Sequence, residues 1–157
     1  MGKKYWLMKS EPSAFSIDDL KKKKEALWDG VRNFQARNFM TKEMKLGDEA
    51  IFYHSNADPP AAVGVLTVSG QAVPDPTQFD ASDSHYDPKS TPANPVWHCV
   101  RVKFKSKFAR PVPLSELREH QSLQKMVLLR KGSRLSIQPV TEAEFKIVCE
   151  LGSRKPK

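Results

Sequence analysis

The segment from residue 97 to residue 105 limits the fold more strongly than any other part of the chain. Its side chains alternate between two sets, His98, Val100, Val102 and Phe104 in one and Cys99, Arg101, Lys103 and Lys105 in the other. Because successive side chains of a β-strand point to opposite faces, this alternation predicts a strand. We expect one face of the strand in the core and a row of cations on the other.

Three further segments are typical of strands. Residues 5–10 form an apolar run that ends at Glu11 and Pro12. Residues 50–54 are apolar on both faces, as in a strand of a barrel or sandwich. Residues 61–68 are rich in β-forming side chains, and Gly64 among them predicts a bulge or the close approach of another backbone.

Two helix starts are marked by capping residues. Ser16 with Asp19, and Thr141 with Glu144, have the spacing of a capping box, in which each side chain caps the other's backbone N–H. They predict a short helix early in the chain and a C-terminal helix that Gly152 ends.

The remaining connections carry short helices and one long loop. The expected short helices cover residues 33–40 (with Phe34 and Met40 turned inward), 114–120 and 123–129. Residues 71–95 hold five prolines among Asp, Ser, Thr and Asn, and a long loop of this kind in a compact domain tends to be functional.

Strands dominate this pattern, and a helix closes it. The sequence therefore predicts an α+β fold, a barrel-like sheet surrounded by short helices with a C-terminal helix. Residues 1–152 are expected to form one domain, a usual size for a single core, and residues 153–157 a basic flexible tail.

The positive charge is concentrated late in the chain. The net charge is +8, made of −1 over residues 1–99 and +9 over residues 100–157. A basic sector on one domain is the electrostatic pattern expected of a nucleic-acid binder, and a solvated lysine-rich face explains it equally well.

Several protein classes are excluded or disfavoured. The apolar stretches are too short for a membrane span, and no signal-peptide core follows the N-terminus. Cys99 and Cys149 are isolated, which indicates small buried residues in a reducing compartment rather than disulfides or a metal site. We expect no cofactor and a cytoplasmic location, or a nuclear one in a eukaryote.

Motifs for catalysis are absent from the sequence. It has no phosphate-binding glycine loop, no nucleophile elbow and no zinc-binding helix motif. The four histidines lack metal-ligand spacing, and His98 is expected to be a hydrogen-bonded structural residue. A Cys–His pair that meets in the fold stays open as an alternative.

Three segments combine aromatic rings with hydrogen-bonding side chains, namely residues 9–11, 28–38 and 53–56. Rings stack on the face of a planar ligand, while Asn, Gln and Ser pair with its edge and Arg or Lys meets a phosphate. The alternative is structural, since Asn33 and Ser55 suit caps or turns and Trp6, Trp28 and Trp97 suit a core.

At these segments the chain resembles the EVE domain family of the PUA-like superfamily. The resemblance is carried in order along nearly the whole chain by residues 5–12, 28–38, 47–55, 74–80, 86–90, 95–97 and 135–141. It implies a PUA-like pseudo-barrel and a non-catalytic module that reads a modified base in nucleic acid, modified cytosine in DNA above all. The base would be flipped out of its helix into an aromatic and polar pocket.

The resemblance also implies which residues bind. The pocket would be formed by Lys9, Ser10, Glu11, Trp28, Val31, Arg32, Asn33, Gln35, Tyr53, His54, Ser55 and Asn56. Trp28 is the residue expected to stack on the base, and Asn33, Gln35 and Ser55 would read its edge. Arg101, Lys103 and Lys105 are expected to contact the phosphate backbone without choosing a base.

Two other functions stay open from the sequence. The first is an enzyme that acts on a modified nucleotide or base in the same pocket, with acid–base chemistry from Lys9, Glu11 or His54. The second is a module whose basic face binds an acidic protein. The expected partner is DNA or RNA with a modified base rather than a membrane, and the protein is expected to be a monomer.

Overall fold

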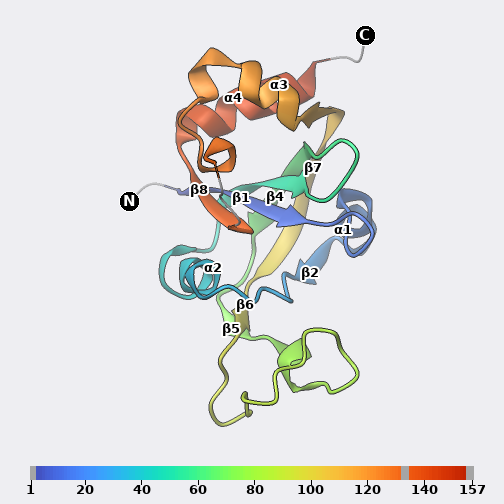
Figure 1. Cartoon of the computed structure of the whole chain (residues 1–157), viewed down its shortest axis with the longest axis vertical. Coiled ribbons are helices and arrows are strands. Elements are labelled where there is room, and N and C mark those ends of the chain that lie inside the picture. Colours follow the sequence, from blue (N-terminus) through green and yellow to red (C-terminus); the bar gives the residue numbers. More distant parts are fainter. Residues whose placement is uncertain (1–2, 132–134, 155–157) are drawn as a thin grey trace.

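The computed structural model describes residues 3–131 and 135–154. Its strands are β1 (Tyr5–Ser10), β2 (Glu25–Leu27), β3 (Glu49–His54), β4 (Ala61–Val68), β5 (Val73–Pro74), β6 (His98–Cys99), β7 (Arg101–Pro113) and β8 (Ile137–Val140). Its α-helices are α1 (Ile17–Lys23), α2 (Phe34–Asn38), α3 (Leu114–Glu119) and α4 (Glu142–Ser153). Figure 1 shows α3 and α4 at one end of the molecule and the β5–β6 arm at the other.

Six strands form one curled sheet in the order β2-β7-β4-β3-β1-β8. β1 and β3 run parallel, and the other neighbouring pairs are antiparallel. β5 and β6 pair with each other in a separate two-stranded sheet. The architecture confirms the α+β barrel-like fold with short helices and a C-terminal helix.

The sheet buries apolar side chains on both faces. Along β1 and β3, Trp6 and Phe52 point into one core, while Leu7 and Ile51 point into a second core that α4 covers. The expectation that β3 is apolar on both faces is confirmed. Buried faces on both sides fix the register, because a shift by one residue would exchange the two cores.

Both predicted capping boxes are present. Ser16 and Asp19 cap α1 reciprocally, and Thr141 and Glu144 do the same for α4. α4 continues through Ser153, one residue beyond the predicted end at Gly152. Of the tail expected at 153–157, residues 155–157 lie outside the described residues.

Gly152 serves close packing rather than helix termination. A Cβ atom at this position would lie 2.3 Å from Cγ of the Phe108 ring, far inside contact distance. Gly64 has the predicted role of a close approach, since its Cβ would lie 2.5 Å from the carbonyl oxygen of Ser106 on β7. The β4–β7 register shifts beside Gly64, as expected for a bulge.

The alternating pattern predicted for residues 97–105 holds from Val100 onward, since Val100 is buried as predicted. Arg101, Lys103 and Lys105 are exposed and alternate with buried Val102 and half-buried Phe104. Before them the pairing breaks at Val100, so the buried side chain of β6 is Cys99 and the half-buried one is His98. The prediction that His98 is hydrogen-bonded is wrong for Nδ1, because this atom is buried without a hydrogen-bond partner among the described residues.

Two predicted helices differ from the structure. In the segment 33–40, Met40 is buried as expected, but Phe34 is 58% exposed and stacks on Trp97 at a centroid distance of 4.9 Å. The segment 123–129 forms no α-helix. Met126 is extended and buried there, and it separates two short 3₁₀ turns (Gln121–Leu123 and Val127–Leu129).

Candidate functional site

A cavity of about 1280 Å³ opens where β1, β2 and β3 end. It is lined by residues 9–11, 14, 15, 27–32, 55, 56, 77, 82–85 and 136. Because β1 and β3 are parallel neighbours, with Ser10 opposite His54, the segments that follow both strands reach the same rim. The long loop between β5 and β6 supplies the opposite wall.

Eight of the predicted pocket residues line this cavity, namely Lys9, Ser10, Glu11, Trp28, Val31, Arg32, Ser55 and Asn56. The structure therefore brings together the three segments that the sequence singled out. It adds a wall formed by Thr77 and residues 82–85, none of which the sequence analysis named as a pocket residue. The proline-rich composition of residues 71–95 was the sequence signal that pointed to this loop.

The other four predicted pocket residues are not among the lining residues. Asn33 caps α2 by accepting the N–H of Ala36 at 3.0 Å, and Gln35 is exposed on the same helix. Tyr53 is 3% exposed in the core beneath α4, and burial raises the pKa of its hydroxyl to about 12.

His54 has a structural contact of its own. Its Nε2 accepts the backbone N–H of Ile17 at 3.1 Å, so the hydrogen of the neutral ring lies on Nδ1. Burial lowers the pKa of His54, which favours this neutral form. Glu11 lines the cavity and His54 does not, so the two do not form an acid–base pair there.

Trp28 forms an aromatic wall of the cavity. Its backbone N–H donates to Val100, and its ring packs edge-to-face with Phe15 and Phe52 at centroid distances of 6.2 and 5.2 Å. The side chain is 6% exposed, so most of the ring belongs to the core and a small part faces the cavity. Its indole N–H has no acceptor among the described residues.

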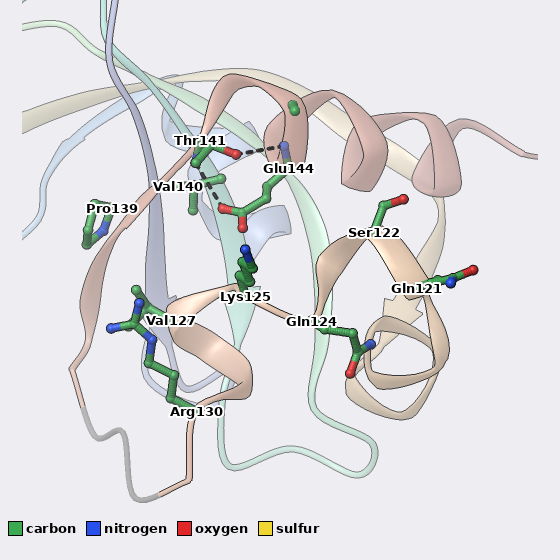
Figure 2. Close-up of a pocket in the computed structure, with 11 residues that line it drawn as sticks. Gln121, Ser122, Gln124, Lys125, Val127, Arg130, Pro139, Val140, Thr141 and Glu144 are labelled. Atoms are coloured by element: carbon green, nitrogen blue, oxygen red, sulfur yellow. Dashed lines mark hydrogen bonds between the residues drawn. The ribbon is translucent and has the colours of Figure 1, made fainter.

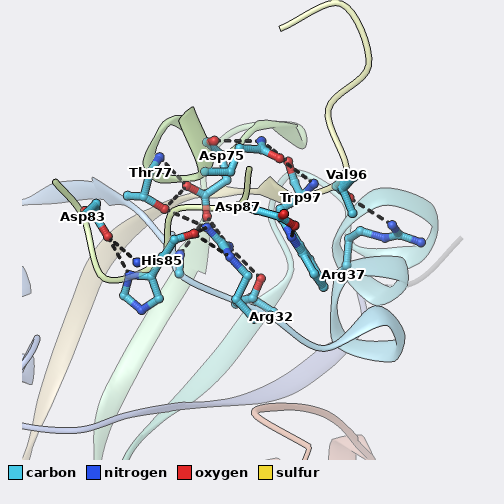
Figure 3. A network of polar contacts seen from close by, with 12 residues as sticks. Arg32, Arg37, Asp75, Thr77, Asp83, His85, Asp87, Val96 and Trp97 are labelled. Atoms are coloured by element: carbon cyan, nitrogen blue, oxygen red, sulfur yellow. Dashed lines mark hydrogen bonds and ion pairs between the residues drawn. The ribbon is translucent and has the colours of Figure 1, made fainter. Parts of the chain in front are cut away.

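Arg32 ties the segment after β2 to the long loop, as Figure 3 shows. Its five N–H groups donate to the carbonyls of Val31 and His85, to Asp75 and to the hydroxyl of Thr77, at 2.7–3.1 Å. A guanidinium has five N–H donors in all, so every one of them has a protein acceptor. Arg32 therefore positions the cavity wall.

Asp75 is the centre of this network. Its side chain is fully buried and accepts from Gly30, Arg32 and Thr77. Burial alone would raise its pKa, but these hydrogen bonds outweigh it and hold the pKa below the ordinary value. Gly30 has a φ of +82°, and a Cβ there would lie 2.9 Å from Nε2 of His85.

The ammonium of Lys9 is a free donor in the cavity. It makes no hydrogen bond or ion pair with the described residues, although its backbone N–H donates to Ser136. Burial lowers the pKa of Lys9. Among the lining residues it is therefore suited to meet a negatively charged or carbonyl oxygen of a ligand.

A second cavity, of about 660 Å³, lies beside the start of α4 (Figure 2). Its lining includes Lys125, Arg130, Thr141 and Glu144. Thr141 and Glu144 are already bonded to each other's backbone in the capping box, as the dashed lines in Figure 2 show. Trp28 and the other aromatic side chains of the first cavity have no counterpart in this lining.

The model of the EVE domain matches residues 4–151. The chain belongs to the EVE family. Thymocyte nuclear protein 1 of Homo sapiens is 46% identical over 171 residues, which cover 97% of this chain and 75% of the relative. The uncharacterized protein C21.03c of Schizosaccharomyces pombe is 40% identical over 170 residues, which cover 99% and 70%.

Solved structures share the fold of this EVE domain. A hypothetical protein from Leishmania major has a TM-score of 0.92 at 42% identity, covering 96% of this chain and 95% of that one. Human THYN1 protein in complex with 5-methylcytosine-containing DNA has a TM-score of 0.90 at 45% identity, covering 98% and 100%. A Zymomonas mobilis ASCH protein, 10% identical with a TM-score of 0.55, shares the fold alone.

The predicted phosphate contacts of the EVE domain lie outside the cavity lining. Arg101, Lys103 and Lys105 project from the exposed face of β7. Nζ of Lys105 lies 2.8 Å from Oε1 of Glu49, an oxygen that Lys3 also contacts at 2.8 Å. A phosphate at this position would compete with Glu49, so Arg101 and Lys103 are the freer members of the row.

Over the parts of the chain that the structure describes, no cluster of His, Cys, Asp and Glu is arranged to hold a metal ion. No helix there has the length and apolar character to cross a membrane. Cys99 is buried, and burial raises the pKa of its thiol to about 12. Cys149 is half-buried with a pKa raised to about 11, so neither thiol is activated as a nucleophile.

Proposed function

We propose that this EVE domain is a nucleic-acid-binding module that reads a modified base, 5-methylcytosine in DNA being the leading candidate. The observation that carries the proposal is the structure of human THYN1, which matches 98% of this chain and was solved with 5-methylcytosine-containing DNA. The cavity supports it, since an aromatic wall at Trp28 and polar groups around the rim suit a planar hydrogen-bonding ligand.

In the proposed mechanism, one set of residues supplies affinity for nucleic acid and another supplies selectivity for the base. The basic face of β7 attracts the phosphate backbone, and a base leaves its stack and enters the cavity beside Trp28. Stacking contributes about 1–3 kcal/mol per base, and removing a base from its helix costs a few kcal/mol. Because these two free energies nearly cancel, the hydrogen bonds inside the cavity determine which bases remain bound in it.

Binding without catalysis is part of the proposal. Oε1 of Glu11 accepts the side-chain amide of Asn56 at 3.3 Å, and His54 is bonded to Ile17 away from the cavity. These contacts keep Glu11 and His54 from acting together as an acid–base pair in the cavity. Turnover of a free modified nucleoside that disappears in Glu11→Gln would refute this part and establish an enzyme.

The test is a titration with DNA that carries cytosine or 5-methylcytosine at one position, at two salt concentrations. We expect tighter binding of the modified DNA and an affinity that falls as salt rises. Trp28→Ala should erase the preference for the modified base; because Trp28 is a core residue, thermal unfolding must first show that the variant folds. Equal binding of both DNAs would refute the proposal.

Neutralising the cations of β7 tests the other half of the mechanism. Changing Arg101, Lys103 and Lys105 to Gln should weaken binding to both DNAs alike. It should also reduce the slope of log affinity against log salt by up to about 0.9 for each phosphate that the variant no longer neutralises. If this variant instead removed the preference for the modified base, the division between affinity and selectivity would be wrong.

A further inference from the structure

Four consecutive lysines, Lys21–Lys24, form a basic surface apart from the face of β7. All four side chains of this lysine run are exposed, and none makes an ion pair with the described residues. Lys21–Lys23 occupy the last turn of α1, and Lys24 is its C-cap. The C-terminal end of a helix favours cations, so the run also has a structural explanation.

The two carboxylates of α1 leave the lysine run without ion-pair partners. Oδ1 of Asp18 lies 2.9 Å from Nζ of Lys107, and Asp19 accepts the backbone N–H of Ser16 in the capping box. Ile17 and Leu20 are buried beneath the helix, which fixes its position on the sheet. The run therefore presents four cations to solvent from an anchored element.

α1 lies at the rim of the first cavity. Figure 1 shows it beside β1 and β2, and the residues just before and after it, Phe15 and Leu27, both line the cavity. Nζ of Lys23 lies 5.7 Å from the centroid of the Phe15 ring, and that ring packs against Trp28. An ammonium of the run is thus one aromatic ring away from the place where the base is proposed to enter.

The backbone of Lys24 gives an independent indication of function. Its φ of +70° lies in a region that favours glycine and is uncommon for a residue with a Cβ. Two hydrogen bonds hold it there, since its N–H donates to the carbonyl of Leu20 and its own carbonyl accepts from Phe104, each at 2.8 Å. Strained residues of this kind cluster at binding sites. A glycine suits this backbone better, so the lysine side chain is present at a cost in stability.

We propose that the lysine run binds the phosphates on either side of the base that enters the cavity. The inference rests on the proposed function and adds the surface that holds the backbone at the cavity rim, while the face of β7 meets phosphates farther along the strand. A flipped base stays attached to its backbone, so its flanking phosphates remain at the rim. Lysine meets a phosphate as a point charge and reads no base.

Changing Lys21, Lys22 and Lys23 to Gln in the full chain tests the proposal. This triple variant should bind duplexes with cytosine and with 5-methylcytosine more weakly by the same factor. Each lost phosphate contact reduces the slope of log affinity against log salt by about 0.9, which is about a fourfold loss of affinity at 0.2 M salt. Three lost contacts give a loss of up to about 80-fold.

The matched control removes the same charge from exposed lysines outside the lining of the first cavity. These lysines also lack ion pairs with the described residues, and they are Lys42, Lys45 and Lys125. Changing them to Gln should weaken binding much less than the triple variant does, because only the general attraction of the protein's net charge is reduced.

Neutral methylphosphonate groups locate the contact on the DNA. Placed one at a time along the methylated strand, they should weaken binding of the wild-type protein most strongly at the two phosphates next to 5-methylcytosine. In the triple variant these two positions should lose their effect, because each change removes one side of the same contact.

Lys24→Gly separates the binding role of this side chain from a structural one. Relief of the strained φ should raise Tm by roughly 2–4 °C. Loss of the ammonium should weaken DNA binding by about fourfold at 0.2 M salt. A lysine that served only the helix end would instead lower Tm when replaced and leave binding unchanged.

The outcomes distinguish this inference from the proposed function. If the wild-type protein binds cytosine and 5-methylcytosine DNA equally, the proposed function fails. The assignment of the lysine run is overturned, and the proposed function stands, under any of three results in a protein that prefers the modified DNA. These are a triple variant that binds as tightly as its control, unchanged methylphosphonate effects in that variant, or wild-type affinity in Lys24→Gly.

Discussion

Replacing Arg32 by lysine tests whether the cavity wall depends on one guanidinium. The substitution keeps the positive charge but removes the planar fork, and an ammonium has three donors in place of five. The ion pair with Asp75, whose side chain is fully buried, would be weakened together with the bonds to Thr77 and the carbonyl of His85.

The expected loss of stability follows from the burial of Asp75. Hydrogen bonds to charged groups contribute about 1.5–3 kcal/mol each, and breaking a buried ion pair outright costs about 3–5 kcal/mol. Asp75 keeps its bonds from Gly30 and Thr77. We therefore expect Arg32→Lys to destabilise the fold by about 2–3 kcal/mol, which lowers Tm by roughly 4–12 °C in a domain of this size.

Arg110→Lys is the matched control for this measurement. Arg110 makes a bidentate contact with the carboxylate of Glu116. Unlike Asp75, Glu116 is partly exposed, and so is Arg110. Such surface pairs contribute about 0–1 kcal/mol. Differential scanning calorimetry of the two variants should show a much larger shift for Arg32→Lys. Equal shifts would refute the argument that burial of Asp75 sets the cost.

The pH dependence gives a second check on the same pair. The folded pKa of Asp75 lies below its ordinary value of 3.8, so its contribution to stability is present above that value and is lost as pH falls through the folded pKa. The difference in Tm between wild type and Arg32→Lys should therefore be full above about pH 5 and shrink below pH 4. A difference that is constant with pH would contradict the assignment to Asp75.

Three further outcomes are expected. Gly152→Ala places a Cβ 2.3 Å from the Phe108 ring and should cost about 1–3 kcal/mol in urea unfolding, whereas an unchanged midpoint would show that the ring moves aside freely. Gly64→Ala, 2.5 Å from the backbone oxygen of Ser106, should cost at least as much, because a strand backbone yields less than a side chain. Cys99, with a thiol pKa of about 12, should resist iodoacetamide at pH 8 until urea unfolds the protein, as mass spectrometry would show; rapid labelling of the native protein would contradict its burial.

The features that sequence predicted correctly are those decided by neighbouring residues. A capping box needs two side chains three positions apart, and both boxes appear where Ser16 and Thr141 predicted them. Strand β1 begins and ends at the predicted residues, because its apolar run is bounded by charged residues and proline. The 3₁₀ turns after α3 were missed, since apolar spacing of three and four also fits an α-helix.

The wall of the cavity could not be predicted residue by residue. Arg32 meets the carbonyl of His85 across 53 positions of sequence, and Gly30 meets Asp75 across 45. Neither pair produces a local pattern in the sequence. The composition of a loop indicates that the loop is irregular, but not which part of the fold it covers. The sequence supported a functional role for residues 71–95, and the structure supplies the contacts.

The segment 28–38 shows why residue type alone did not separate binding from structural roles. Asp29, Arg32 and Asn33 are all polar and lie within five positions, yet the fold gives each a different role. α2 begins at Phe34, so the oxygen of Asn33 is used as its cap. The carbonyl of Val31 and the long loop with Asp75 take up every donor of Arg32. Asp29 alone among the three keeps a side chain without a partner in the described residues, and a ligand can use only the groups that the fold has left free.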